Sequence, residues 1–466
     1  MKKKLIAAGC VLFWLAVWQA GAMLLDQQIL LVSPIQAAAR LCELLPTEGF
    51  RRSVMFSAGR IMTGFALGLA GGTALAVLAG RVRFVKTLLA PLVSAVKAVP
   101  VASITVLALV WVSSRNLSVL VSVLIALPIV YSNMLEGIES LDPKLNEMAK
   151  LLGVSSWRRF TGVYLSQLLP YFRSAARLAV GLSWKSGAAA EIIGIPSGSI
   201  GEKLYQAKIY LETADLFAWT AAVVLLSWLS ERLFMLLVNI AVAAVSGGGR
   251  KRTGASRTEC AQPAAAVTAL DICKSYGGIK VLDGVSLQLS AGSVTAVMGA
   301  SGCGKTTLVS VLEGLTAPDS GEVLISPANT RLSAVFQEDR LCGNLTVLAN
   351  IRLVTGSSRS DEEISAALSA VGLSGCEGRK AGELSGGMKR RAALVRALLA
   401  ESGAIFLDEP FKGLDEQTKA QVAEYCVKML AGRTTVLVTH DRADCEALSA
   451  ERIIEMTAAE QGRDAR

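Results

Sequence analysis

The sequence predicts a multi-domain chain in which an all-α polytopic membrane domain, with about six transmembrane helices, is followed by a soluble α/β domain. Hydrophobic residues make up 52% of the 466 residues and charged residues only 18%, which is typical of a protein with lipid-facing helices. Residues 1–246 carry 22 Lys/Arg against 12 Asp/Glu and all seven Trp, whereas residues 247–466 carry 25 Lys/Arg against 26 Asp/Glu. One half is therefore apolar and basic, and the other has the composition of a soluble domain.

Six apolar runs in residues 1–246 are each long enough for a helix to cross the hydrocarbon core of a bilayer. These runs are Leu5–Leu25, Phe56–Gly80, Leu88–Val112, Leu117–Leu135, Pro170–Ile195 and Leu216–Val245. A cleaved signal peptide is the alternative for the first run, because Ala20-Gly21-Ala22 is similar to a cleavage site. The apolar stretch is long for a signal peptide, so a sixth span is favoured.

The distribution of basic residues predicts the orientation of these spans. With six spans, all four basic clusters between the runs fall on one side, which the positive-inside rule assigns to the cytoplasm. The clusters are Lys2–Lys4, Arg81–Lys86, Lys144–Arg159 and Arg250–Arg252. The lipid membrane thus explains the net charge of +9, and we expect no nucleic-acid partner. The nine Cys form no C-x-x-C pair, which indicates a reduced compartment without a zinc site.

The stretch 136–165, between the fourth and fifth runs, is too long and polar to be a tight turn. Residues Glu147–Leu152 suit a short helix, and Gly153 can adopt the left-handed conformation that ends it. Ser155 or Ser156 can cap a following helix. The stretch therefore predicts a compact helix–turn–helix at the cytoplasmic face.

Residues 247–266 are small, polar and basic, which predicts a flexible linker before a domain at 267–466. In that domain the buried-strand candidate Ser293–Met298 leads into a glycine-rich loop and then a helix, the context that a P-loop requires. The loop residues are Gly299, Ser301, Gly302, Cys303, Gly304, Lys305, Thr306 and Thr307. Backbone N–H groups of such a loop face the phosphates of ATP, while Lys305 reaches the β- and γ-phosphates and the Thr306 hydroxyl binds Mg²⁺.

A second strand candidate, Ala404–Leu407, ends in two acids that complete the nucleotide chemistry. Asp408 fits the Mg²⁺ site of a Walker B strand. Glu409 follows it, where a general base can polarise the attacking water. Between the P-loop and this strand, Ser385, Gly386 and Gly387 precede a helix and form a further anion-binding helix end.

The run Leu384–Met388 resembles the signature sequence of ABC ATPases, with Met388 where Gln is usual. The resemblance implies that Ser385, Gly386 and Gly387 contact the γ-phosphate of ATP bound to a partner subunit. It also implies roles for four residues outside the P-loop and Walker B strand: adenine stacking for Tyr276, sensing of Mg²⁺ and water by Gln337, a D-loop position for Asp415, and γ-phosphate orientation by His440.

Glu147, Ala149 and Gly153 resemble the EAA loop of bacterial ABC importer permeases of type I. The downstream sequence from Trp184 to Asp215 is similar to the sequences of the permease subfamily that handles nitrate, sulfonates and taurine. Two departures are Met148, where Ala is frequent, and Ser166, where Pro is common. In that family the loop docks into a groove on the ATPase, so the resemblance implies a coupling role.

Together these features predict an ATP-driven importer of a small solute, with permease and ATPase in one chain at the plasma (inner) membrane and the ATPase domain in the cytoplasm. The resemblance implies ATP and Mg²⁺ as cofactors, a separate solute-binding protein, and a homodimer or a heterodimer with a related half. A nitrate-, sulfonate- or taurine-like solute and a thiamine-precursor pyrimidine remain open. The alternatives are an ABC exporter half-transporter and a membrane-anchored regulatory ATPase.

Overall fold

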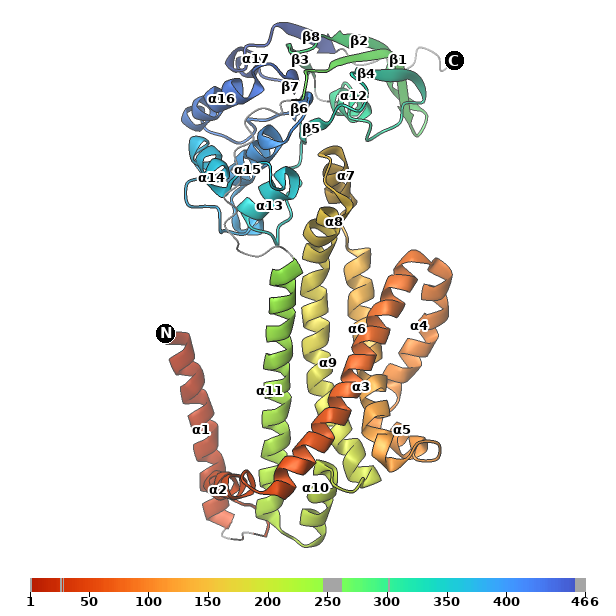
Figure 1. Cartoon of the computed structure of the whole chain (residues 1–466), viewed down its shortest axis with the longest axis vertical. Helices are drawn as coiled ribbons and strands as arrows, with labels where there is room; N and C mark the ends of the chain where they lie inside the picture. The colour runs from red at the N-terminus through yellow and green to blue at the C-terminus, as the bar shows by residue number, and fades with distance from the viewer. Residues whose placement is uncertain (1, 26, 28, 246–261, 301, 457–466) are drawn as a thin grey trace, which may run out of the picture. The chain divides into compact units, whose positions relative to one another are not determined.

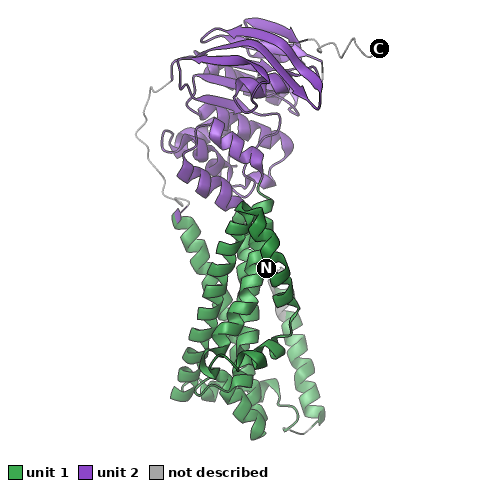
Figure 2. Ribbon diagram, turned by 90° about the vertical axis from the view of Figure 1, so that its right-hand side faces the viewer, with its two compact units in different colours: residues 1–141, 168–244 green, residues 142–167, 245–466 purple. Residues whose placement is uncertain are grey.

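The computed structural model describes residues 2–25, 27, 29–245, 262–300 and 302–456 (Figure 1). The chain divides into two compact units, coloured separately in Figure 2. Unit 1 comprises Met1–Leu141 and Leu168–Ala244, and unit 2 comprises Asp142–Gln167 and Val245–Arg466. The division assigns the stretch around the predicted helix–turn–helix to the same unit as the C-terminal half. Most of the predicted linker 247–266 lies outside the described residues.

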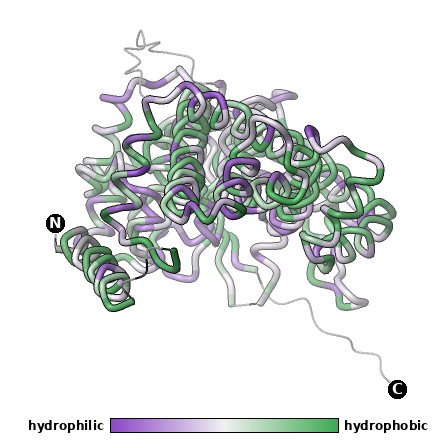
Figure 3. Tube along the Cα trace, turned by 90° about the horizontal axis from the view of Figure 1, so that it is seen from below, coloured by the Kyte–Doolittle hydropathy of each residue, from purple (hydrophilic) through white to green (hydrophobic). Residues whose placement is uncertain are grey.

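A helix or helix pair occupies each of the six predicted apolar runs. The helices of this part of the chain are α1 (Lys2–Leu25), α2 (Pro34–Leu44), α3 (Glu48–Arg81), α4 (Arg83–Ala98), α5 (Val101–Ala108), α6 (Ser114–Glu139), α9 (Leu165–Gly194), α10 (Ile200–Ile209) and α11 (Thr213–Val245). Figure 3 shows the hydrophobic colouring that runs along α1, next to the N-terminus.

Within the described residues, three helices are long and apolar enough to cross a membrane: α3, α6 and α11. The pair α4 and α5 is bent by 99° and makes a fourth if it is one broken span. The apolar part of α1 that was searched, Gly9–Leu25, is shorter than a span, and α9 carries four charged residues. The expected number of about six is therefore not reached by length and apolar composition alone.

Helices α3 and α6 lie side by side because glycines on α3 leave room for the backbone of α6 (Figure 1). A Cβ atom at Gly64 would lie 2.4 Å from the Val119 carbonyl oxygen, and one at Gly68 would lie 2.6 Å from the Ala126 Cβ. A Cβ at Gly72 would lie 2.7 Å from the carbonyl oxygen of Leu127. This small-residue spacing is how membrane helices approach closely.

Among the described residues of unit 1, one carboxyl group is fully buried, that of Glu191 on α9. The hydroxyl of Ser57 on α3 donates to Glu191 Oε2 at 2.6 Å, and the N–H of Gly201 on α10 donates to the same oxygen at 3.4 Å. The Ser57 hydroxyl in turn accepts from the N–H of Ile200 at 2.9 Å. Three helices are thereby joined through neutral hydrogen-bond donors.

Unit 2 begins with a helical segment and continues as an α/β domain. The helical segment contains α7 (Pro143–Leu151), α8 (Ser156–Arg159) and a π-helical turn, η1 (Phe160–Tyr164). The strands are β1 (Ala266–Tyr276), β2 (Ile279–Leu289), β3 (Val294–Gly299), β4 (Ser320–Ser326), β5 (Leu332–Val335), β6 (Ala404–Asp408), β7 (Thr434–Val438) and β8 (Arg452–Met456). The remaining helices are α12 (Lys305–Leu312), α13 (Val347–Thr355), α14 (Asp361–Ala370), α15 (Gly386–Leu399), α16 (Glu416–Leu430), α17 (Arg442–Ala447) and the 3₁₀ turn η2 (Ala381–Glu383).

The strands form two sheets. An antiparallel sheet has the order β2-β1-β4, and a parallel sheet has the order β5-β6-β7-β3-β8. Strands β6 and β7 are buried along their whole length, as apolar and β-branched residues in a central parallel strand should be. Because parallel strands end at one edge, the loops that follow β3, β5, β6 and β7 meet there, where open α/β sheets bind ligands.

Candidate functional site

The glycine-rich loop connects β3 to α12, as the sequence predicts. Gly302 and Gly304 adopt left-handed φ values of 85° and 97°, which glycine reaches without steric cost, and Gly304 is the N-cap of α12. The Lys305 Nζ donates to the carbonyl oxygens of Gly299 and Ala300 at 2.7 and 2.8 Å. Cys303 is buried beneath the loop. Ser301 lies outside the described residues.

A cavity of about 240 Å³ lies at the edge of the sheet where β3, β5, β6 and β7 end. It is lined by Val281, Gly302, Gly304, Lys305, Thr306, Thr307, Gln337, Asp408, Glu409 and His440. The structure therefore brings together the predicted P-loop, both Walker B acids, the Gln of the predicted Q-loop and the predicted switch histidine. Elements separated by more than a hundred residues converge because of the strand order alone.

The two acids after β6 have different surroundings. Burial, reinforced by the charge of Glu409, raises the pKa of Asp408 to about 6. Burial also acts to raise the pKa of Glu409, but contacts with Lys412 and His440 hold that pKa below its usual value. The Lys412 Nζ lies 3.0 Å from Glu409 Oε2, and the His440 Nδ1 lies 3.3 Å from Glu409 Oε1. Glu409 is thus held as a carboxylate between two nitrogen groups.

The donors in the cavity fit Mg²⁺ bound together with a nucleotide. The Thr306 hydroxyl, the Gln337 amide oxygen and the Asp408 carboxylate all line the same cavity, and oxygen donors are the ligands that Mg²⁺ prefers. Among the described residues, no three His, Cys, Asp or Glu side chains cluster as a metal site. That is expected where Mg²⁺ takes one or two protein carboxylates and completes its shell with water and phosphate oxygens.

The predicted signature residues lie at the start of α15, apart from those that line this cavity. Ser385 is the N-cap of α15 and accepts from the N–H of Met388 at 3.4 Å. A Cβ at Gly387 would lie 3.3 Å from the Gly413 carbonyl oxygen, so the signature end packs against the predicted D-loop. Asp415 caps α16 by accepting from the Thr418 N–H at 2.9 Å.

Tyr276, at the end of β1, is likewise not among the residues that line the cavity. It is half exposed, and the Lys274 Nζ lies 5.6 Å from the centre of its ring. Its accessible face is consistent with a stacking partner, and its adenine-binding role remains a prediction.

The segment 142–167 packs against the α/β part of unit 2 through one buried side of α7. Met148 and Ala149 are both fully buried and belong to the same apolar core as Phe336 and Leu353. Gly153 ends this helical stretch with φ of 64°, which confirms the predicted left-handed turn. Met148, which stands where the family frequently has Ala, therefore contributes to this apolar contact.

Polar contacts surround that apolar contact. The Lys144 Nζ lies 2.7 Å from Glu338 Oε1, and the Arg340 Nη1 lies 3.2 Å from Glu147 Oε2. The Arg158 Nη1 donates to the Val354 carbonyl oxygen at 3.1 Å. Glu338 and Arg340 lie one and three residues after Gln337, so the segment contacts the loop whose Gln lines the cavity.

The second short helix starts differently from the expectation. Ser155 stands at the N-cap position of α8, but its hydroxyl makes no capping bond to the helix backbone. It accepts instead from the Arg158 Nε at 3.2 Å. The side chain of Arg158 reaches this oxygen because it lies one turn along the same helix.

Several residues in these contacts were not singled out from the sequence. Arg390 lies in Lys389-Arg390-Arg391, a run that has the appearance of a solvated face, yet its side chain is 4% exposed. Lys412 and Arg340 belong to no sequence motif that would single them out, although each lies within three residues of a predicted site residue. Proximity to Gln337 and Glu409 is the signal that could have found them.

Comparisons with known proteins agree with this arrangement. The family described as "Binding-protein-dependent transport system inner membrane component" matches residues 72–247, and the family "ABC transporter" matches residues 282–412. The chain is 40% identical over 192 residues to the aliphatic sulfonates import ATP-binding protein SsuB 1 of Nocardia farcinica, which covers 41% of this chain and 77% of that protein.

Two other relatives are import ATP-binding proteins as well. The chain is 36% identical over 200 residues to an SsuB 1 of Pseudomonas aeruginosa, covering 40% of this chain and 80% of that protein. It is 38% identical over 205 residues to the sulfate/thiosulfate import ATP-binding protein CysA 2 of Chromobacterium violaceum, covering 40% of this chain. The chain spans 55% of the length of that last relative.

Proposed function

This chain belongs to the ABC transporter family and joins a permease domain of the binding-protein-dependent type to an ATP-hydrolysing domain of the import type, and from that premise we propose that it carries a small solute into the cell. The solute we propose is nitrate-, sulfonate- or taurine-like, or a thiamine-precursor pyrimidine. The chain is an inner membrane protein by family. We propose that it is multi-pass with the ATPase domain in the cytoplasm, because the basic clusters gather on that side.

The observation that carries the proposal is the docking of segment 142–167 within unit 2. Glu147 pairs with Arg340, and Met148 is buried in the core that contains Phe336. A change in the loop around Gln337 on binding or hydrolysis of ATP would therefore move a segment continuous with α6 and α9. If the protein were an exporter or a regulatory ATPase, there would be no reason to expect an EAA-like segment to contact the loop around Gln337.

Hydrolysis is assigned to the cavity residues. Lys305 and the N-terminus of α12 would hold the phosphates, and Thr306, Gln337 and Asp408 would hold Mg²⁺. Bound Mg²⁺ supplies charge neutralisation for the phosphoryl group. The Glu409 carboxylate would accept a proton from the attacking water, with His440 orienting the γ-phosphate.

We propose a dimer in which each ATP site is composite, with the P-loop cavity from one subunit and the signature residues from the other. Ser385, Gly386 and Gly387 are not among the residues that line the cavity of their own chain, and their helix end suits an anion. Two copies related by a twofold axis would each offer this end to the other's nucleotide. A related half in a heterodimer would do the same. A separate solute-binding protein would deliver the solute.

Solute depletion from the medium tests the proposal. Cells expressing the wild type or Glu409→Gln, each with a candidate binding protein, would receive nitrate, taurine, alkanesulfonates and a thiamine-precursor pyrimidine. We expect the wild type alone to deplete one class. Glu424→Gln is a matched control, because that glutamate is 71% exposed and pairs only across one helix turn with Lys428. Outward accumulation would favour the exporter, and active ATPase without any flux would favour the regulatory protein.

A further inference from the structure

Two residues next to the catalytic cavity have a backbone conformation that non-glycine residues rarely adopt. Glu409 has φ of 47° and Arg340 has φ of 44°, both in the left-handed region. Such a conformation costs free energy and persists only where the surroundings hold it. Each of these residues has a role in the site: Glu409 as the proposed base, and Arg340 as the partner of Glu147.

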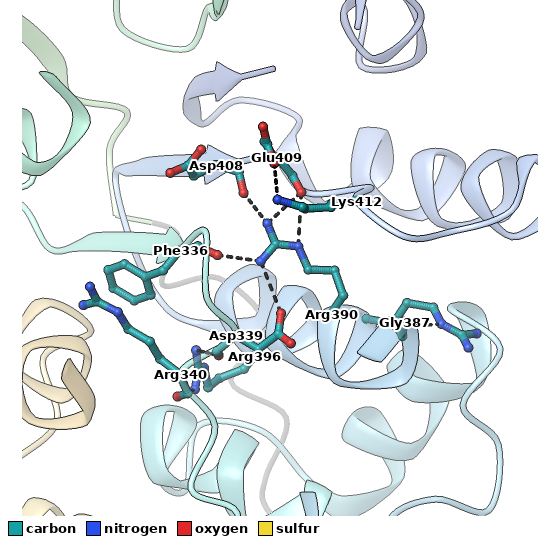
Figure 4. A network of polar contacts seen from close by, with 10 residues as sticks. Phe336, Asp339, Arg340, Gly387, Arg390, Arg396, Asp408, Glu409 and Lys412 are labelled. Carbon is teal, nitrogen blue, oxygen red and sulfur yellow. Dashed lines mark hydrogen bonds and ion pairs between the residues drawn. The ribbon is translucent and has the colours of Figure 1, made fainter. Parts of the chain in front are cut away.

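The side chain of Arg390, on α15, holds the backbone at Glu409 (Figure 4). Its Nη2 and Nε donate to the Glu409 carbonyl oxygen at 2.6 and 3.1 Å, and Nη2 also donates to the Asp408 carbonyl oxygen. These two carbonyls belong to the end of β6, where the ladder of the sheet stops. The guanidinium therefore adds donors to backbone acceptors at this strand end, where the Glu409 carbonyl oxygen also accepts from the Lys412 N–H at 3.2 Å.

The other end of the same guanidinium reaches the chain that follows β5. Arg390 Nη1 donates to the Phe336 carbonyl oxygen at 2.5 Å and to Asp339 Oδ1 at 3.2 Å. Phe336 and Asp339 flank Gln337, which lines the cavity. One buried side chain thus joins the loop of the predicted Mg²⁺-sensing Gln to the strand end that carries the proposed base.

Arg396, also on α15, repeats this pattern at the second strained residue. It is fully buried and donates through Nη1 to the Arg340 carbonyl oxygen at 2.6 Å and through Nη2 to the Asp339 carbonyl oxygen at 3.2 Å. Burying a guanidinium is costly unless its donors are satisfied, and the Arg396 Nε has no hydrogen-bond partner among the described residues. That two buried arginines of one helix each hold the carbonyl of a left-handed residue indicates a function beyond core packing.

We infer that Arg390 is a positioning residue for ATP hydrolysis, which fixes the backbone of Glu409 and ties it to the loop that carries Gln337. The planar guanidinium offers five donors in a fixed fork and here contacts four acceptors on two separate segments. A glutamine side chain is too short to hydrogen-bond to both segments, and lysine lacks the planar, forked set of N–H donors. Loss of Arg390 should let the strained Glu409 backbone relax and turn its carboxylate away from the attacking water.

The kinetics of the full-length protein in detergent or liposomes test this inference through Arg390→Lys and Arg390→Gln. Because the P-loop and not Arg390 holds the nucleotide, we expect kcat to fall by at least about tenfold for the glutamine variant and less for the lysine variant, with KM for ATP changed by less than about threefold. Arg433→Gln is the control, because Arg433 is half-buried and donates to the Leu398 carbonyl oxygen, away from the cavity. It should lower the melting temperature and leave kcat unchanged.

A double-mutant cycle with Glu409→Gln separates positioning from general damage. If Arg390 acts through Glu409, adding Arg390→Lys to Glu409→Gln should lower kcat by less than about twofold. Multiplicative losses in the double variant, or a kcat loss in Arg433→Gln as large as that in Arg390→Gln, would overturn the inference. So would a wild-type kcat in Glu409→Gln. ATP binding by the lysine variant, followed by fluorescence of a nucleotide analogue, reports that the domain is folded.

Discussion

A buried carboxyl in unit 1 and two buried guanidinium groups in unit 2 are held in different ways. In unit 1 the buried carboxyl of Glu191 accepts from the neutral donors Ser57 and Gly201. In unit 2 the buried charges of Arg390 and Arg396 are each fixed by several backbone carbonyls. In unit 1 the close approach of α3 and α6 depends on the absence of side chains at Gly64, Gly68 and Gly72.

The difference indicates what each unit tolerates. A hydrogen bond from a neutral donor contributes roughly 0.5–3 kcal/mol and can be exchanged when helices shift, whereas a buried charge that loses all its partners costs more. Unit 1 should therefore be sensitive to steric change and permissive of rearrangement. Unit 2 should be sensitive to changes in charge and geometry around its cavity.

The largest effect is expected at the P-loop. Lys305→Ala removes the amine that lies over the loop carbonyls and would otherwise meet the phosphates, so ATPase activity should fall on the order of a thousandfold, about 4 kcal/mol. Lys428→Ala, an exposed lysine paired with Glu424, should leave the rate within about twofold. Phosphate release at saturating ATP measures both, and equal rates in the two variants would contradict the site.

The next effect tests the steric sensitivity of unit 1. Gly64→Val places side-chain atoms against the Val119 carbonyl, so α3 and α6 must separate, and the loss of stability should be about 3 kcal/mol. A Cβ atom at Gly59 on the same helix meets no atom within 4 Å, so Gly59→Val should cost less than about 1 kcal/mol. Thermal unfolding in detergent compares the pair. Similar melting temperatures for both variants would show that α3–α6 contact is not limiting.

A smaller effect is expected where the segment 142–167 docks. Met148→Ala leaves a cavity in a fully buried contact and should weaken docking by about 2 kcal/mol. Lys150→Ala, on the same helix but exposed, should have little effect. The readout is the stimulation of ATPase activity by solute and binding protein, which Met148→Ala should reduce while basal activity persists. Full stimulation in that variant would argue against a coupling role for this contact.

The smallest effect concerns the exposed ion pair of the same segment. Lys144 and Glu338 are 48% and 64% exposed, so Lys144→Gln should cost no more than about 1 kcal/mol. Its effect on stimulation should shrink further at high salt, because exposed charges are screened. An effect as large as that of Met148→Ala, and independent of salt, would show that charge rather than apolar contact holds the segment.

The sequence predicted the parts of the site that depend on local spacing. The P-loop, Asp408 and Glu409 follow strands whose apolar runs are visible in the sequence, and β3 and β6 lie where those runs predict. Predicting the cavity would have required the strand order. That order places β7 between β6 and β3 and brings His440 to Glu409. That order is set by long-range packing and leaves no local pattern.

Other structural features could not be predicted because the local sequence at those residues is typical of a different structure. A run of three basic residues around Arg390 is ordinarily solvated, and only its position on α15 between two strand ends makes it buried. Helix α9 occupies an apolar run but carries four charges, so composition alone does not identify it as a span. Left-handed backbone at Glu409 and Arg340 is likewise invisible, because neither residue type favours it.

The central claim is that ATP hydrolysis at this cavity drives solute inward, and simultaneous measurement of both in liposomes tests it most directly. Purified wild-type protein and Glu409→Gln would be reconstituted with the ATPase domain outward, with ATP outside and solute with its binding protein inside. We expect solute to leave the lumen toward the ATPase side only with the wild type, and only while phosphate is released. Phosphate release without solute movement, or solute movement of equal rate in Glu409→Gln, would contradict it.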